Sequence, residues 1–211
     1  MRHRQLQFDA SVACGRDLRD GRLDLFVAHY LVFDPDKIPI RGKDPMCVRN
    51  GVPVFCGPNG VPQERHRLYH NNGDGTFTDV SEKAGILGVK PNYALTATAA
   101  DFDGDGWPDI YVACDTAPSL FYRNNHDGTF SEVAVPAGCA FDEHGVALAG
   151  MGAGVGDYDG DGWLDIVRTN FSEQVPTLYR NYGAGFEVTI AGSLRSNTAP
   201  CEPPPHSSPA R

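Results

Sequence analysis

Two stretches share one pattern: DFDGDGWPD at residues 101–109 and DYDGDGWLD at residues 157–165. Each places four aspartates within nine residues and leads directly into a strand-like run. Carboxylates this close repel one another, at a cost on the order of 1 kcal/mol per pair in water and more near a protein surface. A compact loop of this composition is therefore best explained by a hard cation held among its oxygens.

The opening D-x-D-x-D-G is also how an EF-hand loop begins. An EF-hand needs a glutamate at its twelfth position and a helix on either side. The twelfth residue here is Val112 in one copy and Arg168 in the other, and both flanks have the pattern of strands. The EF-hand is therefore excluded.

The loops instead offer side-chain oxygens at positions 1, 3, 5 and 9 and a backbone carbonyl at position 7. Oxygen ligands in a flexible loop favour Ca²⁺ over Mg²⁺ and argue against zinc. The alternative, simple Asp/Gly turns, is disfavoured because the spacing is kept twice. We expect two calcium sites, one from Asp101, Asp103, Asp105, Asp109 and the Trp107 carbonyl, the other from Asp157, Asp159, Asp161, Asp165 and the Trp163 carbonyl.

The repeat continues beyond the loops. Hairpin-like segments follow them, LFYRNNHDGTF at residues 120–130 and LYRNYGAGF at residues 178–186, and an earlier counterpart, LYHNNGDGTF, occupies residues 68–77. Asn-Gly and Asp-Gly supply the positive φ that tight hairpin turns require. The pattern predicts three units, at about residues 17–86, 97–140 and 150–190.

The first unit has a damaged loop. Upstream of its hairpin stands RDLRDGRLD at residues 16–24, in which Asp20, Gly21 and Asp24 match the second half of the pattern. Counted from Asp17, the first half of the pattern is one residue shorter than in the intact loops, and it lacks two of their acids. We expect this loop to bind metal weakly or not at all.

A proline-rich insertion, about residues 33–67, interrupts the first unit and needs bracing. Cys47 and Cys56 lie nine residues apart in it, which makes a disulfide between them the expected brace. Cys114 closes one predicted strand and Cys139 follows the next hairpin, so they are a candidate second pair. The spacing of the six cysteines favours disulfides over zinc, although six reduced thiols remain an open alternative.

Composition narrows the classes of function. The formal charge of −9 argues against a nucleic-acid partner, because phosphate contacts need Lys and Arg. No apolar run reaches the roughly 18 residues of a membrane span, and no signal peptide is visible at the N-terminus. Residues 191–211 are polar and proline-rich, which predicts a disordered tail.

The Asp loops and the N-N-x-D-G-T-F hairpins resemble FG-GAP/VCBS repeats, the blades of integrin-α-like β-propellers. The segments VFCGP at residues 54–58, 68–86 and GMG at residues 150–152 look like the group of secreted or envelope proteins that carry an ASPIC/UnbV segment. The resemblance covers about residues 17–190. It implies an all-β fold of about three blades of an incomplete propeller, with each calcium loop between the first two strands of its blade.

No catalytic motif can be assigned, since nucleophile-elbow, zinc-protease and P-loop patterns are all missing from the sequence. Glu143-His144 is the one acid–base pair we considered, and an exposed loop contact is the commoner explanation. The resemblance implies a calcium-binding, non-catalytic module for a protein or glycan partner, outside the cell, in the periplasm or at the cell surface. The alternatives are an accessory domain of a secreted enzyme, or a truncated or frameshifted gene fragment. Exposed blade faces further predict self-association.

Overall fold

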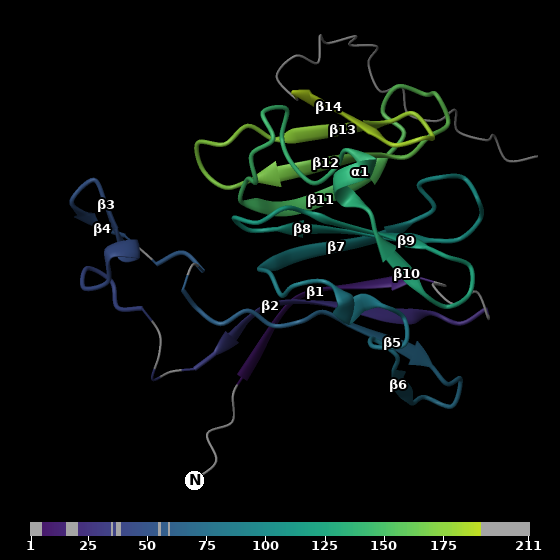
Figure 1. The fold of residues 1–211 in the computed structure, drawn as a ribbon, viewed down its shortest axis with the longest axis horizontal. Coiled ribbons are helices and arrows are strands. Elements are labelled where there is room, and N and C mark those ends of the chain that lie inside the picture. The colour runs from purple at the N-terminus through teal and green to yellow at the C-terminus, as the bar shows by residue number, and fades with distance from the viewer. Residues whose placement is uncertain are drawn as a thin grey trace, which may run out of the picture.

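The computed structural model describes three stacked sheets and an insertion that projects from the first of them (Figure 1). The described residues are 6–15 (backbone only), 21–34, 36, 39–54, 56–58 and 60–190. The predicted tail, residues 191–211, and residues 16–20 of the damaged loop lie outside them.

Each sheet has four antiparallel strands, and we call the sheets blades one, two and three. The strand orders are β1-β2-β5-β6, β10-β9-β8-β7 and β11-β12-β13-β14. The strands are β1 (Leu6–Gly15), β2 (Asp24–Phe33), β5 (Arg67–Asn71) and β6 (Phe77–Asp79); β7 (Ala94–Ala100), β8 (Asp109–Cys114), β9 (Leu120–Asn124) and β10 (Phe130–Glu132); β11 (Gly150–Gly156), β12 (Asp165–Asn170), β13 (Thr177–Asn181) and β14 (Phe186–Ile190). The expected all-β fold is confirmed, because these sheets are about three propeller blades and the described residues do not close into a ring.

Blade one begins earlier in the chain than the repeat pattern. Its first strand, β1, pairs with β2 along its whole length and lies ahead of residue 17. The connection from β1 to β2 therefore corresponds to the connections β7–β8 and β11–β12, so all three blades have the same strand plan.

Helical structure is confined to short connections. They are η1 (Pro45–Cys47), η2 (Ile86–Gly88) and α1 (Ala134–Ala137). In the part of the chain that is described, no helix is long and apolar enough to cross a membrane.

Two hydrophobic cores hold the blades together, one at each junction. The core between blades one and two joins Phe26 and Leu68 of blade one to Tyr122 of blade two, with the Phe26 and Tyr122 rings 5.8 Å apart. The core between blades two and three packs Phe121 against Phe186, whose ring centroids are 5.5 Å apart. Burial of each such side chain contributes about 1.5–3 kcal/mol.

The position of a blade in the stack explains the burial of its strands. Every residue of β8 is buried, because blade two has a neighbour on both sides. In β12 of blade three, Ile166 and Arg168 are buried while Val167 between them is exposed. One face of β12 therefore packs on blade two and the other does not.

Arg168 is unusual among these buried residues. Its guanidinium is fully buried, donates to the hydroxyls of Ser119 (2.9 Å) and Thr177 (3.3 Å), and lies 5.3 Å from the centre of the Tyr179 ring. Ser119 precedes β9 in blade two, so this side chain is a polar link across the junction between blades two and three.

The insertion between β2 and β5 contains a small two-stranded sheet, β3 (Val48–Arg49) with β4 (Val52–Pro53). The expected Cys47–Cys56 disulfide is present and braces it. The second expected pair was wrong: Cys114 and Cys139 are both buried free thiols. Cys114 belongs to the core between blades one and two and Cys139 to the core between blades two and three, so the two thiols belong to opposite sides of blade two.

Candidate metal-binding loops

The two intact Asp loops connect the first and second strands of blades two and three, as the resemblance implied. In each loop the first aspartate organises the turn. Asp101 accepts hydrogen bonds from the amides of Asp105 (3.1 Å) and Gly106 (2.9 Å). Asp157 does the same for Asp161 (3.1 Å) and Gly162 (2.9 Å).

The loops bring carboxylate oxygens together. The groups are Asp101, Asp103 and Asp105 in blade two, and Asp157, Asp159 and Asp165 in blade three, with the oxygens of each group within 4.8 Å of one another. Calcium ligands lie 2.3–2.6 Å from the ion, so opposite ligands are at most about 5 Å apart. The oxygens of both groups are therefore close enough together to coordinate one calcium ion.

Asp103 carries the clearest sign that a cation fits. Its Oδ1 is buried and has no hydrogen-bond partner in the described structure. Burial raises the pKa of this carboxyl, and the negative charge of Asp105 raises it further, although Arg123 opposes both. An ion among the oxygens would supply the missing partner and remove the repulsion.

The aspartate at the ninth position of each loop, Asp109 or Asp165, also holds the loop to its hairpin. Asp109 accepts the amide of Asn124 in β9 (2.9 Å) and that of Phe102 in its own loop (3.3 Å). Burial raises the pKa of Asp109 to about 7, and the nearby charge of Asp103 contributes in the same direction. The carboxylate therefore fastens the loop to the hairpin of the same blade.

Asp165 repeats this arrangement in blade three, accepting the amides of Asn181 (2.7 Å) and Tyr158 (3.0 Å). The sequence suggested only metal ligation for Asp109 and Asp165. Whether they, Asp161 and the carbonyls of Trp107 and Trp163 coordinate an ion stays a prediction.

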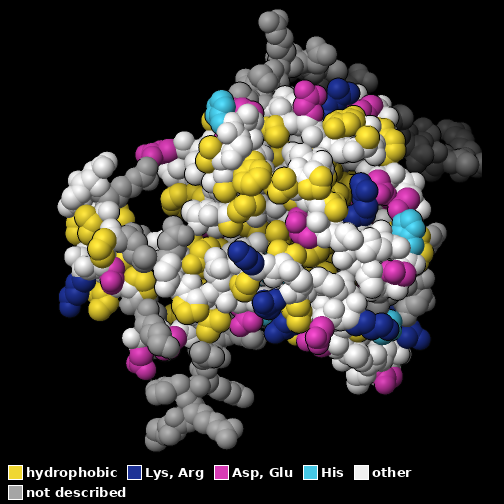
Figure 2. Space-filling model, viewed as in Figure 1, with side chains coloured by type: hydrophobic (Ala, Val, Ile, Leu, Met, Phe, Trp, Pro, Cys, Tyr) yellow, Lys and Arg dark blue, Asp and Glu magenta, His cyan; other side chains and the backbone are white. Residues whose placement is uncertain are grey.

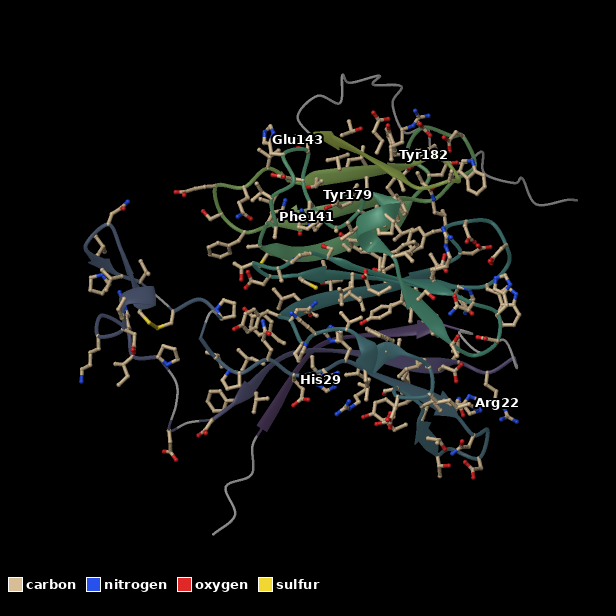
Figure 3. The ribbon with its side chains drawn as sticks, in the orientation of Figure 1. Arg22, His29, Phe141, Glu143, Tyr179 and Tyr182 are labelled. Carbon is tan, nitrogen blue, oxygen red and sulfur yellow. A yellow bond between two sulfur atoms is a disulfide. The ribbon has the colours of Figure 1, made fainter. Side chains whose placement is uncertain are left out.

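Basic side chains from the hairpins face the loops, and the sequence-based interpretation missed them. Arg123 lies 3.5 Å from Asp103, and His126 contacts Asp105. In blade three Arg180 lies 2.7 Å from Asp159 and 3.3 Å from Asp161, and these contacts raise its pKa. Both hairpins share the sequence Tyr-Arg-Asn, which could have pointed to a common role for Arg123 and Arg180. Charged side chains accordingly gather on the right-hand side of the molecule (Figure 2), the side on which Arg22 also lies (Figure 3).

The tryptophan rings differ between the two loops. Trp107 stacks on His126, with ring centroids 5.2 Å apart and an interplanar angle of 11°. The Trp163 ring lies between Gly183 of its own hairpin and Gly104 of the preceding blade, where an added Cβ would be 2.6 Å and 3.1 Å from ring carbons. Trp163 therefore packs between blades.

The described part of the damaged loop in blade one, from Gly21 onward, keeps the hydrogen bond that ties the loop to its hairpin. Asp24 accepts the amide of Asn71 (2.9 Å) and contacts Nδ1 of His70 (3.0 Å). Arg22 stands where the other loops have tryptophan, and its guanidinium lies over Gly73, 2.7 Å from where a Cβ would be. It donates to the carbonyl oxygen of Asn72 (3.0 Å).

Glu143 lies on a loop away from the Asp loops (Figure 3), and His144 follows it in the chain. Their side chains are 3.5 Å apart, and that of His144 is 76% exposed. Glu143 and His144 therefore form an exposed loop contact, which is the explanation that the sequence favoured over a catalytic pair.

Comparison with known proteins agrees with this geometry. The family described as FG-GAP-like repeat matches residues 54–112 and 101–168. Cartilage acidic protein 1 of Xenopus tropicalis is 27% identical over 135 residues, which are 63% of this chain. The chain spans 19% of the length of that relative.

Proposed function

This chain belongs to the FG-GAP-like repeat family, and on that premise we propose that it is a calcium-binding, non-catalytic propeller module that acts outside the cell. The observation that carries the proposal is the gathering of three carboxylates within 4.8 Å in each intact loop. The unpartnered, buried Oδ1 of Asp103 supports it independently.

Calcium has a structural role in this proposal. When bound, the ion supplies positive charge to the carboxylates and lets the loop stay compact. The chain itself does the rest: Asp109 and Asp165 tie each loop to its hairpin, and Arg123 and Arg180 offset part of the negative charge.

A protein or glycan is the proposed partner, and the junction between blades one and two offers a place for a small polar group. A cavity of about 380 Å³ opens there, lined by Val80, Lys83, Trp107, His126, Asp127 and Gly128. At the next junction the cavity lined by Gly183 and Gly185 is only about 10 Å³. The larger cavity is lined by His126 and Asp127, where blade three has Gly183 and Ala184. An aromatic surface flanked by charged groups suits a sugar ring and its hydroxyls.

The location outside the cell is supported by the family and by the Cys47–Cys56 disulfide, since disulfides persist in oxidising compartments.

Thermal unfolding of the full chain in Ca²⁺ and in EGTA tests the proposal. We expect Ca²⁺ to raise the melting temperature and the double variant Asp103→Ala/Asp159→Ala to abolish that rise. Asp36→Ala/Glu143→Ala removes two carboxylates outside the loops and should respond to Ca²⁺ like the unmodified chain. Equal melting temperatures of the unmodified chain in Ca²⁺ and EGTA would refute the calcium role.

A further inference from the structure

The two junctions between the blades share one framework of aromatic rings. Between blades one and two, the rings of Phe26 and Tyr122 lie 5.8 Å apart. Between blades two and three, Tyr111 and Tyr179 occupy the same two strand positions, and their rings lie 6.2 Å apart; Tyr179 is labelled in Figure 3. The second junction therefore repeats the first and adds one phenolic hydroxyl, that of Tyr111.

A buried charge also distinguishes the second junction. Arg168 and Val112 each lie three residues after the last aspartate of their loop, and both side chains are fully buried. The guanidinium of an arginine stays protonated in a protein. Burying such a charge is costly unless it is paired and hydrogen-bonded. An arginine where the other junction has valine therefore needs negative charge close to it.

No carboxylate among the described residues pairs with Arg168. Its hydrogen bonds go to the neutral hydroxyls of Ser119 and Thr177, and its Nε has no partner among those residues. Glu132 and Asp142 are acids of the surrounding segments, but each accepts backbone amides instead of the guanidinium. The arginine is therefore not balanced by an ion pair in this part of the chain.

The phenols and thiols whose pKa the charge of Arg168 affects are neutral as well. They are Tyr111, Tyr179, Cys114 and Cys139. Burial raises the pKa of all four groups, and the positive charge of Arg168 opposes this rise without cancelling it. At neutral pH none of them supplies a negative charge to the arginine.

Unpartnered hydrogen-bond donors gather at the same place. The hydroxyls of Tyr111 and Tyr179 and the Nε of Arg168 are buried, and none has a hydrogen-bond partner in the described structure. Burial raises the pKa of both phenols, while Ser119 lowers that of Tyr111 and Tyr111 lowers that of Tyr179, which places the three hydroxyls near one another. Buried donors beside an unbalanced positive charge have the chemistry of an anion site.

We propose that the junction between blades two and three binds one small inorganic anion, which the guanidinium of Arg168 and the hydroxyls of Tyr111 and Tyr179 hold. The anion balances the buried charge and accepts the donors that no other group accepts. Because Tyr111 belongs to blade two and the other two residues to blade three, the anion links the blades. Both blades that form the site lie within this chain, and the site is separate from the Asp loops.

Thermal unfolding of the full chain in NaCl and in sodium gluconate, at equal sodium concentration, tests the site. Chloride is the probe, and gluconate is the anion too large for a buried site. EGTA in both buffers keeps the measurement independent of calcium. We expect the melting temperature to be about 3–5 °C higher in chloride, at about ten times its dissociation constant. Equal melting temperatures in the two salts would overturn the proposal.

Three variants separate anion binding from a general effect of the salts. Arg168→Met removes the charge at similar volume and should abolish the response to chloride. Tyr111→Phe restores the ring of the first junction and should weaken chloride binding roughly fivefold, since one donor is lost. Tyr122→Phe removes a hydroxyl of the first junction that is also buried and unpartnered, and it should respond like the unmodified chain. A full chloride response in Arg168→Met, or equal responses in the two phenylalanine variants, would contradict the site.

Bromide distinguishes an anion from a water molecule at this place, because bromide scatters anomalously. In crystals of the full chain grown in NaBr, we expect an anomalous peak beside the Arg168 guanidinium and the two hydroxyls. A water molecule there, or bromide bound on the surface alone, would overturn the proposal.

Discussion

The Asp loops of blades two and three each hold on to a hairpin and gather three carboxylates, whereas the described residues of the blade-one loop show the first of these features alone. Asp24, Asp109 and Asp165 occupy the same position and each accepts the backbone amide of an asparagine in the next hairpin. Among the described residues, the clusters of three carboxylates lie in the loops of blades two and three. In blade one, Arg22 lies over the hairpin where the others place tryptophan. The hydrogen bond that holds the loop to its hairpin is therefore separable from the clustering of carboxylates.

The largest expected effect comes from removing the Asp109 carboxylate, which holds the loop of blade two to its hairpin. Asp109→Ala leaves the amides of Phe102 and Asn124 without their acceptor, and each such loss costs about 1–3 kcal/mol. We expect a loss of about 4 kcal/mol in unfolding free energy, larger in Ca²⁺ than in EGTA because a proposed ligand is removed as well. Denaturant titration in both conditions measures this.

Asp24→Ala sharpens the comparison. It should also destabilise the chain, by about 2 kcal/mol for the Asn71 amide, but equally in Ca²⁺ and EGTA. A calcium-dependent cost at Asp24 would contradict the separation of the two tasks.

Acid sensitivity should also differ between the blades. His66, in front of β5, accepts the His29 amide (3.2 Å) and contacts Asn92 Oδ1 (2.9 Å), while Ser119 and Pro176 stand at the matching positions. Burial lowers the pKa of His66 from 6.5 to about 4, with His29 adding to the shift and Asn92 opposing it.

Acid destabilises the folded chain because, as the pH falls, His66 is protonated in the unfolded chain before it is protonated in the folded one. Stability from His66 is fully present above pH 6.5 and is lost as the pH falls to about 4, by about 3 kcal/mol in total. His66→Gln removes this titration, so its unfolding free energy should fall less steeply with acid than that of the unmodified chain. Parallel slopes from pH 6.5 to 4 would contradict the prediction.

A smaller effect tests the packing of the Trp163 ring at the junction between blades two and three. Gly183 and Gly160 have similar φ angles, +81° and +78°, but only Gly183 has the Trp163 ring where a Cβ would stand. Alanine at either position strains the backbone by about 1–2 kcal/mol. At Gly183 the clash with Trp163 should add about 2 kcal/mol. Thermal unfolding of the two alanine variants measures the difference, and equal melting temperatures would show that the ring moves aside freely.

The sequence was sufficient for the parts that repeat. The two loops, their place between first and second strands, and the three sheets follow from a pattern that is local in the chain. The strand Leu6–Gly15 was missed because the loop after it is damaged, although Leu6, Phe8, Ala10 and Val12 alternate with other residues.

Contacts between repeats were beyond the sequence pattern. Spacing alone does not say which face of a blade a residue occupies, which is why Cys114 and Cys139 looked like partners. The pattern also did not reveal contacts between loop and hairpin within a blade, namely the ion pairs of Arg123 and Arg180 and the hydrogen bonds that Asp109 and Asp165 accept. These depend on where the hairpin folds relative to the loop, a distance of 15 to 21 residues along the chain.

Isothermal titration calorimetry with Ca²⁺ tests most directly whether the intact loops hold metal and the damaged one does not. The unmodified chain should take up two ions, Asp103→Ala and Asp159→Ala one each, and the double variant none. Uptake of no calcium by the folded chain, or of a third ion that is lost on Asp24→Ala, would contradict it.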